Sequence, residues 1–189
     1  MSTSVTVVFL LYNAERTVPM LVRALSRQHR GGVPQEQWLE ALFVDDLSRD
    51  RTLELLDRCL EERGRPRHWR VVPHERNLGL AATLNDALSR AATPFVLTCH
   101  CDCEFGREDY VSRMAELMSS RTDAAAITGK PAIAPGRRMP FAERVNLVAN
   151  LMDVLPPNTG DELVPVGFAE GRCDIFRVDA LRAVGFYDT

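Results

Sequence analysis

Ala41-Leu-Phe-Val-Asp45-Asp46 is an apolar run that stops abruptly at two carboxylates, and this stretch decides the fold. A second run, Pro94-Phe-Val-Leu-Thr-Cys99, is followed by His100-Cys101-Asp102. Short apolar runs that end at acids are typical of buried strands in an open α/β sheet, where ligands bind at the carboxyl ends of the strands. The two acidic strand ends therefore predict a site for a polar ligand that carries a nucleotide, together with a divalent cation.

A strand–helix rhythm runs through the chain up to about residue 123. Strands are expected at 5–11, 41–44, 69–73 and 94–99, each followed by apolar residues at helical spacing. Four such units in a row predict an α/β fold with a mainly parallel sheet and right-handed crossovers. Farther on we expect a strand at 124–128, a helix carrying Phe141, Val145, Val148 and Met152, and a Pro- and Gly-rich loop at 155–167.

The composition is that of a soluble globular protein, with 189 residues, 46% apolar and 26% charged. A net charge of −3 gives no reason to expect nucleic acid as a partner. No apolar stretch approaches the ~20 residues that span a bilayer, and the start lacks the features of a signal peptide. The five cysteines form an odd set, three of them crowded between 99 and 103, which favours a reducing compartment. We expect a cytoplasmic protein. A peripheral position at the inner face of the membrane would also be consistent with these features.

The end of the fourth strand offers ligands for a metal. If the backbone stays extended there, His100, Asp102 and Glu104 share one face and the three cysteines share the other. Carboxylates suit Mg²⁺ or Mn²⁺, and the imidazole favours Mn²⁺. A thiolate zinc site is the rival interpretation, although structural zinc sites usually show wider cysteine spacing. The cysteines could also simply pack in the core, and Asp102 could cap a helix.

The acidic pair at the second strand end allows two roles. Adjacent carboxylates repel, so we expect one of Asp45 and Asp46 to cap the following helix, for which Ser48 is a further N-cap candidate. The other acid could accept a hydrogen bond from a base N–H or a ribose hydroxyl. Asn77 and Gly79 form either a plain turn or part of the site, and Arg76 could face a phosphate or water.

Five blocks of this sequence resemble, in order and spacing, the family 2 inverting glycosyltransferases. They are Val7-Val-Phe-Leu-Leu-Tyr12-Asn13, Val44-Asp-Asp-Leu-Ser48-Arg-Asp50-Arg-Thr52, Asn77-Leu-Gly79-Leu-Ala-Ala-Thr-Leu-Asn85, Leu97-Thr-Cys-His100-Cys-Asp102 and Glu170-Gly171 to Asp188. The resemblance covers nearly the whole chain. It implies a GT-A fold, which is a Rossmann-like αβα sandwich, and a single domain over residues 1–189.

The resemblance also implies a function. It is the metal-dependent transfer of a sugar, with inversion, from a nucleotide-diphosphate sugar to a hydroxyl acceptor, with a UDP-sugar as the default donor. A nucleotide-sugar-binding domain without turnover is the alternative. A sugar nucleotidylyltransferase is disfavoured, because Tyr12-Asn13-Ala14-Glu15 stands where such enzymes carry a Gly-rich, basic phosphate loop.

The resemblance finally implies site residues. Those expected to bind the donor are Leu11, Tyr12, Asn13, Glu15, Asp45, Asp46, Arg76, Asn77, Gly79, Asn85, His100, Cys101 and Asp102. Asp102 and His100 are expected to hold Mn²⁺ or Mg²⁺. Two departures from the family are that His100 replaces the first acid of its Asp-x-Asp and that Leu47 replaces a glycine.

The catalytic base of the family is usually an acid downstream of its Gly-Phe-Asp segment. By resemblance we expect that base beyond Thr189, on an acceptor side that is truncated here. Asp188 and Glu170 are the candidates within the chain, and Asp188 more closely matches a structural position of the motif.

Overall fold

The computed structural model describes residues 4–129, 163, 165, 166, 169 and 171–188. In chain order the elements are β1 (Val5–Leu11), α1 (Val18–Ser26), the short 3-10 helix η1 (Gln35–Gln37), β2 (Leu39–Asp45), α2 (Thr52–Glu61), β3 (Trp69–Pro73), α3 (Leu80–Ser89), β4 (Phe95–His100), α4 (Tyr110–Ser120), β5 (Ala126–Thr128), β6 (Cys173–Arg177) and α6 (Val178–Val184). The strands and helices expected before residue 129 are confirmed. The helix expected around 141–152 lies outside the described residues, as does almost all of the loop expected at 155–167.

Among the described residues, the sheet has six strands in the order β3-β2-β1-β4-β6-β5. The first four are mutually parallel, whereas β6 runs antiparallel between β4 and β5. The predicted mainly parallel sheet is therefore confirmed. The chain steps outward from β1 to β2 and β3, then returns to place β4 on the other side of β1. The carboxyl ends of β1 and β4 thus flank a topological switch point, where open α/β sheets bind ligands.

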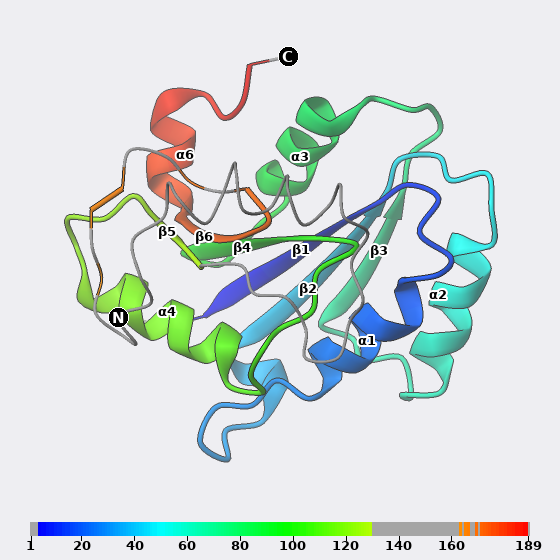
Figure 1. Ribbon diagram of the computed structural model, residues 1–189, viewed down its shortest axis with the longest axis horizontal. Coiled ribbons are helices and arrows are strands. Elements are labelled where there is room, and N and C mark those ends of the chain that lie inside the picture. Colours follow the sequence, from blue (N-terminus) through cyan, green and yellow to red (C-terminus); the bar gives the residue numbers. More distant parts are fainter. Residues whose placement is uncertain (1–3, 130–162, 164, 167–168, 170, 189) are drawn as a thin grey trace, which may run out of the picture.

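Helices cover both faces of the sheet and make an αβα sandwich (Figure 1). The apolar sides of α1, α2 and α4 pack on one face, and those of α3 and α6 pack on the other. Alternate residues of each buried strand serve the two faces, so Phe9 and Leu11 join the first cluster while Val8 joins the second. This two-sided burial explains why the strands are continuous apolar runs.

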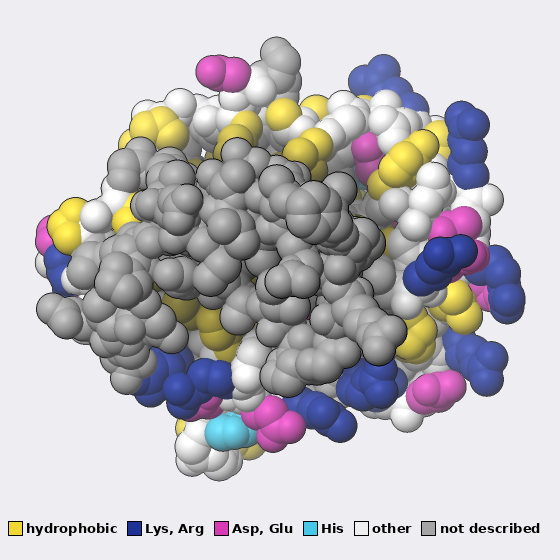
Figure 2. Space-filling view, in the orientation of Figure 1, with side chains coloured by type: hydrophobic (Ala, Val, Ile, Leu, Met, Phe, Trp, Pro, Cys, Tyr) yellow, Lys and Arg dark blue, Asp and Glu magenta, His cyan; other side chains and the backbone are white. Residues whose placement is uncertain are grey.

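The surface mixes charges of both signs. In the described part of Figure 2, arginines and acids are interspersed around the rim. Several form exposed ion pairs, such as Arg51 with Glu54 and Arg65 with Asp57, and pairs of this kind add little stability. Within the described ranges, none of the helices has the length and apolar character needed to cross a membrane.

Candidate functional site

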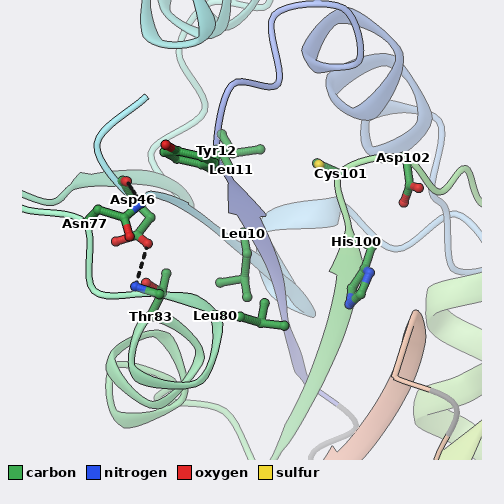
Figure 3. Close-up of a pocket in the computed structure, with 11 residues that line it drawn as sticks. Leu10, Leu11, Tyr12, Asp46, Asn77, Leu80, Thr83, His100, Cys101 and Asp102 are labelled. Atoms are coloured by element: carbon green, nitrogen blue, oxygen red, sulfur yellow. Dashed lines mark hydrogen bonds between the residues drawn. The ribbon is translucent and has the colours of Figure 1, made fainter. Parts of the chain in front are cut away.

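A cavity of about 420 Å³ opens at the carboxyl ends of β1 and β4 (Figure 3). Its described lining comprises Leu10, Leu11 and Tyr12 at the end of β1, Asp46 after β2, Asn77, Gly79, Leu80 and Thr83 around the start of α3, and His100, Cys101 and Asp102 at the end of β4. Its size and its mixture of apolar wall with a few polar groups are those of a small-molecule site. The cavity lies at the switch point described above.

The polar groups stand on two walls. In Figure 3, Asp46 and Thr83 lie across the cavity from His100 and Asp102. Two large apolar side chains of the lining are unusually open to solvent, with Tyr12 49% exposed and Leu80 64% exposed. They leave apolar surface that a planar ligand group can cover.

The Asp46 carboxylate is almost buried, at 6% residue exposure, and holds the loop before α3. It accepts hydrogen bonds from Leu78 N–H at 2.7 Å and from Gly79 N–H at 2.9 Å, while its carbonyl accepts one from the Asn77 amide at 3.0 Å. Burial opposes ionisation, but the hydrogen bonds from Leu78, His74, Thr83 and Gly79 outweigh it and lower the pKa of Asp46. Asp46 therefore faces the cavity as a fixed carboxylate.

The other acid of the pair, Asp45, is turned into its own loop. It accepts hydrogen bonds from both the backbone N–H and the hydroxyl of Ser48. The expectation that one of the two acids caps the following helix is wrong, as is the expectation that Ser48 does. Helix α2 begins at Thr52, and the N–H of Thr52 is bound by Asp50 at 3.0 Å. Ser48 lies four residues before Thr52, and its oxygen accepts the N–H of Asn13 instead.

The loops after β1 and β2 are tied together beside the cavity. The N–H of Asn13 donates to Ser48 Oγ at 2.9 Å, and Arg49 N–H donates to Asn13 Oδ1 at 2.9 Å. The N–H of Glu15 donates to Asp50 Oδ2 at 3.1 Å. Asn13 and Glu15 thus brace the β1 loop and are not among the described residues that line the cavity, and Asp45 is not among them either.

Leu47 adopts a left-handed backbone with φ of 62°. That conformation costs an L-residue about 1–2 kcal/mol. We expect Leu47→Gly to raise the free energy of unfolding by up to about 1 kcal/mol, because glycine relieves the strain at some cost in unfolded-chain entropy.

Leu53→Gly is the matched control for Leu47→Gly. Leu53 is exposed to nearly the same degree, 36% against 37%, but lies inside α2, where glycine should lower stability by about 1 kcal/mol. Urea unfolding of both variants measures this, and a loss of stability in Leu47→Gly would contradict it.

Other expected site residues lie away from the cavity lining. Arg76 is exposed on the loop before α3. The Asn85 amide exchanges two hydrogen bonds with the backbone of Tyr187, at 2.8 and 3.0 Å, and so fixes the segment after α6 to α3. Asp188 is exposed, and Glu170 lies outside the described residues.

The end of β4 departs from the expected alternation. The strand ends at His100, and a turn closed by Cys103 N–H donating to His100 O at 3.1 Å follows it. The prediction that Glu104 shares a face with His100 and Asp102 is therefore wrong, because the backbone no longer alternates after His100. His100 and Asp102 both line the cavity.

The cysteines of this segment behave as core residues. Cys99 is 2% exposed, and Cys101 and Cys103 pack against the larger apolar cluster. In the part of the chain that the structure describes, no group of three or more His, Cys, Asp or Glu side chains is arranged to hold a metal ion. The thiolate zinc interpretation thus has no support among these residues. Asp102 and His100 offer two ligands of the type that Mg²⁺ or Mn²⁺ accepts when phosphate oxygens complete the set.

Sequence reasoning missed several residues of the site. Leu10, Leu80 and Thr83 line the cavity, and the buried Thr83 hydroxyl helps to lower the pKa of Asp46. Thr83 follows Gly79 by one helical turn, so its spacing could have placed it. His74, which contacts Asp46, follows β3 directly and could have been found by the strand-end rule applied to the other strands.

One buried acid belongs to the sheet instead. Asp174 on β6 is fully buried and accepts hydrogen bonds from the Thr128 hydroxyl and the Gly171 N–H, both at 2.6 Å. Burial raises its pKa, against those two hydrogen bonds. Asp174 thus joins β6 to β5 and to the turn that precedes β6.

Comparisons with known proteins agree with this geometry. The family model described as Glycosyl transferase family 2 matches residues 6–185. TarS 1–349 of S. aureus in complex with UDP has a TM-score of 0.72 at 21% identity, over 98% of this chain and 50% of that chain. The same protein with UDP-GlcNAc gives 0.72 and 21%, over 98% and 48%. The mannosyltransferase PcManGT from Pyrobaculum calidifontis, in complex with GDP-Man and Mn²⁺, gives 0.68 and 19%, over 97% and 47%.

The chain thus spans about half the length of these solved structures. Comparison with the curated proteins gives no match. The structural likeness shows a shared fold and confirms the predicted GT-A sandwich. Since the family model covers almost the entire sequence, the chain belongs to glycosyl transferase family 2.

Proposed function

We propose that this glycosyltransferase binds a nucleotide-diphosphate sugar, with a UDP-sugar as the preferred donor, and transfers the sugar to a hydroxyl acceptor with inversion. The observation that carries the proposal is the cavity at the switch point, with a fixed carboxylate on one wall and Asp102 and His100 on the other. The UDP, UDP-GlcNAc and GDP-Man complexes of the structurally similar proteins support a donor of this class.

Asp46 marks the side of the cavity proposed for the base. Its carboxylate is held in place and can accept a further hydrogen bond from a base N–H. The buried Thr83 hydroxyl lines the cavity and helps to lower the pKa of Asp46, which keeps that carboxylate ionised. Tyr12 and Leu80 supply exposed apolar surface at the same cavity.

Asp102 and His100 mark the side proposed for the diphosphate. Their oxygen and nitrogen ligands suit Mn²⁺ or Mg²⁺, with diphosphate oxygens completing the coordination. When bound, the cation would neutralise charge that builds on the departing diphosphate. Asp102 is exposed within the turn that follows β4, so it can reach a bound ion without breaking core contacts.

Inversion requires a base that removes the proton from the acceptor hydroxyl. Asp45 and Asp46 are both engaged by loop hydrogen bonds, which argues against either in that role. Asp188 and Glu170 are the first acids of this chain to test for the role by mutation.

Nucleotide binding is the direct test. UDP with Mn²⁺ is expected to raise the melting temperature, since a ligand at a hundred times its dissociation constant adds roughly 2.7 kcal/mol of stability. The shift should decrease when the metal is removed with a chelator. Uridine serves as the control, because without the diphosphate its binding should not respond to the metal. If no nucleoside diphosphate shifts the melting temperature, with or without metal, the donor-site proposal is wrong.

A further inference from the structure

A buried histidine joins Asp46 of the cavity wall to Asp86 on α3. The side chain of His74 is 8% exposed, and its two ring nitrogens face two different acids. Nδ1 lies 3.0 Å from Asp46 Oδ1, and Nε2 lies 3.2 Å from Asp86 Oδ2. A neutral imidazole has a single N–H, so it can donate to only one of them. This geometry is satisfied when both nitrogens carry protons.

The surroundings of His74 form a row of alternating charge. Asp86 is also bound by Arg90, with Nε at 2.7 Å and Nη2 at 2.9 Å from its two oxygens. The charged groups that face His74 among the described residues are Asp46 beyond β2 and Asp86 on α3. Burial works against the charged ring, yet the two carboxylates prevail and raise the pKa of His74 above its usual value.

His74 also completes the fixation of Asp46. Oδ1 of Asp46 accepts from His74 and Leu78, and Oδ2 accepts from Gly79. Both oxygens of the carboxylate are therefore held, and the neighbouring Thr83 hydroxyl also helps to lower its pKa. The imidazolium thereby contributes to the orientation of Asp46 and to the charge of the cavity wall.

We propose that His74, as an imidazolium, is a positioning residue for nucleotide binding: it holds the Asp46 carboxylate toward the cavity and offsets its charge. The inference rests on the proposed function, since the cavity must accept the nucleotide. When His74 loses its second proton, one of its two acids faces a lone pair. Asp86 keeps Arg90, whereas Asp46 loses its cationic partner, so affinity for an anionic nucleotide should decrease as pH rises.

The expected direction of the pH dependence follows from the raised pKa of His74. Below pH 6.5, which is the ordinary pKa of a histidine, the His74 ring is charged in both the folded and the unfolded chain. Its stabilising contribution is complete there and disappears as pH rises through the higher folded-state pKa. Weakening of nucleotide binding should begin in this same range above 6.5.

Calorimetric titration of UDP from about pH 6 to 9 tests this in the wild type and two variants. In wild type the dissociation constant is expected to rise by about tenfold over this range, whereas His74→Gln should bind about tenfold more weakly at the low end and lose most of the pH dependence. Asp86→Asn places an amide beside the His74 ring, and an amide can pair with a neutral imidazole. In this variant the weakening of UDP binding should therefore occur at lower pH than in wild type.

Two controls match these variants. His68→Gln replaces a half-buried histidine at the opposite end of β3, and Asp123→Asn breaks an exposed arginine pair with Arg121. Both should bind UDP as wild type does. Nitrogen-15 NMR of His74 provides a readout without ligand, in which both ring nitrogens should be protonated at neutral pH in wild type.

The outcomes separate the two proposals. If His74→Gln binds UDP with the affinity and pH profile of wild type, the proposed role of His74 is wrong and the donor-site proposal stands. No binding by wild type at any pH overturns the proposed function, and the role of His74 with it. If His74→Gln does not fold, Asp86→Asn decides, since a pH profile identical to that of wild type contradicts the inference.

Discussion

Asp102→Asn is expected to weaken Mn²⁺-dependent binding of UDP by about 10- to 100-fold while the fold stays intact. The side chain is exposed in the turn after β4, and its described partner is a weak 3.6 Å contact from the Cys103 thiol. The change therefore removes a charged metal ligand without opening the core. Calorimetric titrations with Mn²⁺ and with a chelator measure the difference, and an unchanged thermal unfolding curve without ligand verifies the fold.

Cys101→Ala is the matched control from the same cavity. Cys101 precedes Asp102 and packs against the larger apolar cluster, so its loss should lower stability modestly and change binding little. The opposite pair of results, with metal binding abolished by the cysteine change and retained by the aspartate change, would favour a thiolate site.

Phe43→Ala is expected to lower the free energy of unfolding by about 3–5 kcal/mol. Phe43 is fully buried at the centre of β2 and stacks on Phe9 across the parallel pair, with ring centroids 5.0 Å apart. Its ring also meets Trp69 of β3 at 6.3 Å. Truncation would leave a cavity that three adjacent strands cannot close. Urea unfolding followed by circular dichroism measures the loss.

Two further variants calibrate that result. Phe43→Leu keeps most of the volume and should cost less than Phe43→Ala, whereas Val184→Ala removes a side chain that is 76% exposed and should stay within about 0.5 kcal/mol of wild type. If Phe43→Ala loses less than about 1 kcal/mol, the stacked rings of Phe43 and Phe9 are not a main source of stability.

The parallel half of the fold could be predicted because its signals are local. Each of β1, β2 and β4 is a run whose alternate residues are buried on the two faces, and the helices that follow show their own period. Strand β6 was not predicted. Its five residues, Cys173–Arg177, include Asp174 and Arg177, and the position of β6 between β4 and β5 depends on pairing with distant segments.

The site was predictable where strand ends determine position. The rule that the carboxyl ends of parallel strands meet at one edge places Tyr12, Asp46 and Asp102 at one cavity. It could not tell Asp45 from Asp46, or place Asn13. Which side chain faces a cavity is decided by hydrogen bonds between loops, such as those from Ser48 and Gly79, and these leave no periodic trace in the sequence.

The position of β6 has a consequence for synthesis of the chain. Strand β4 is complete at His100, yet the strand that covers its outer edge is made only at Cys173–Arg177, and β5 pairs with β6 rather than with β4. At about 5–20 residues per second, the ribosome needs roughly 4–15 seconds to produce the missing strand. Throughout that interval the apolar edge Phe95–His100 can pair with a neighbouring nascent chain. Slower translation of the intervening segment should therefore lower the soluble yield.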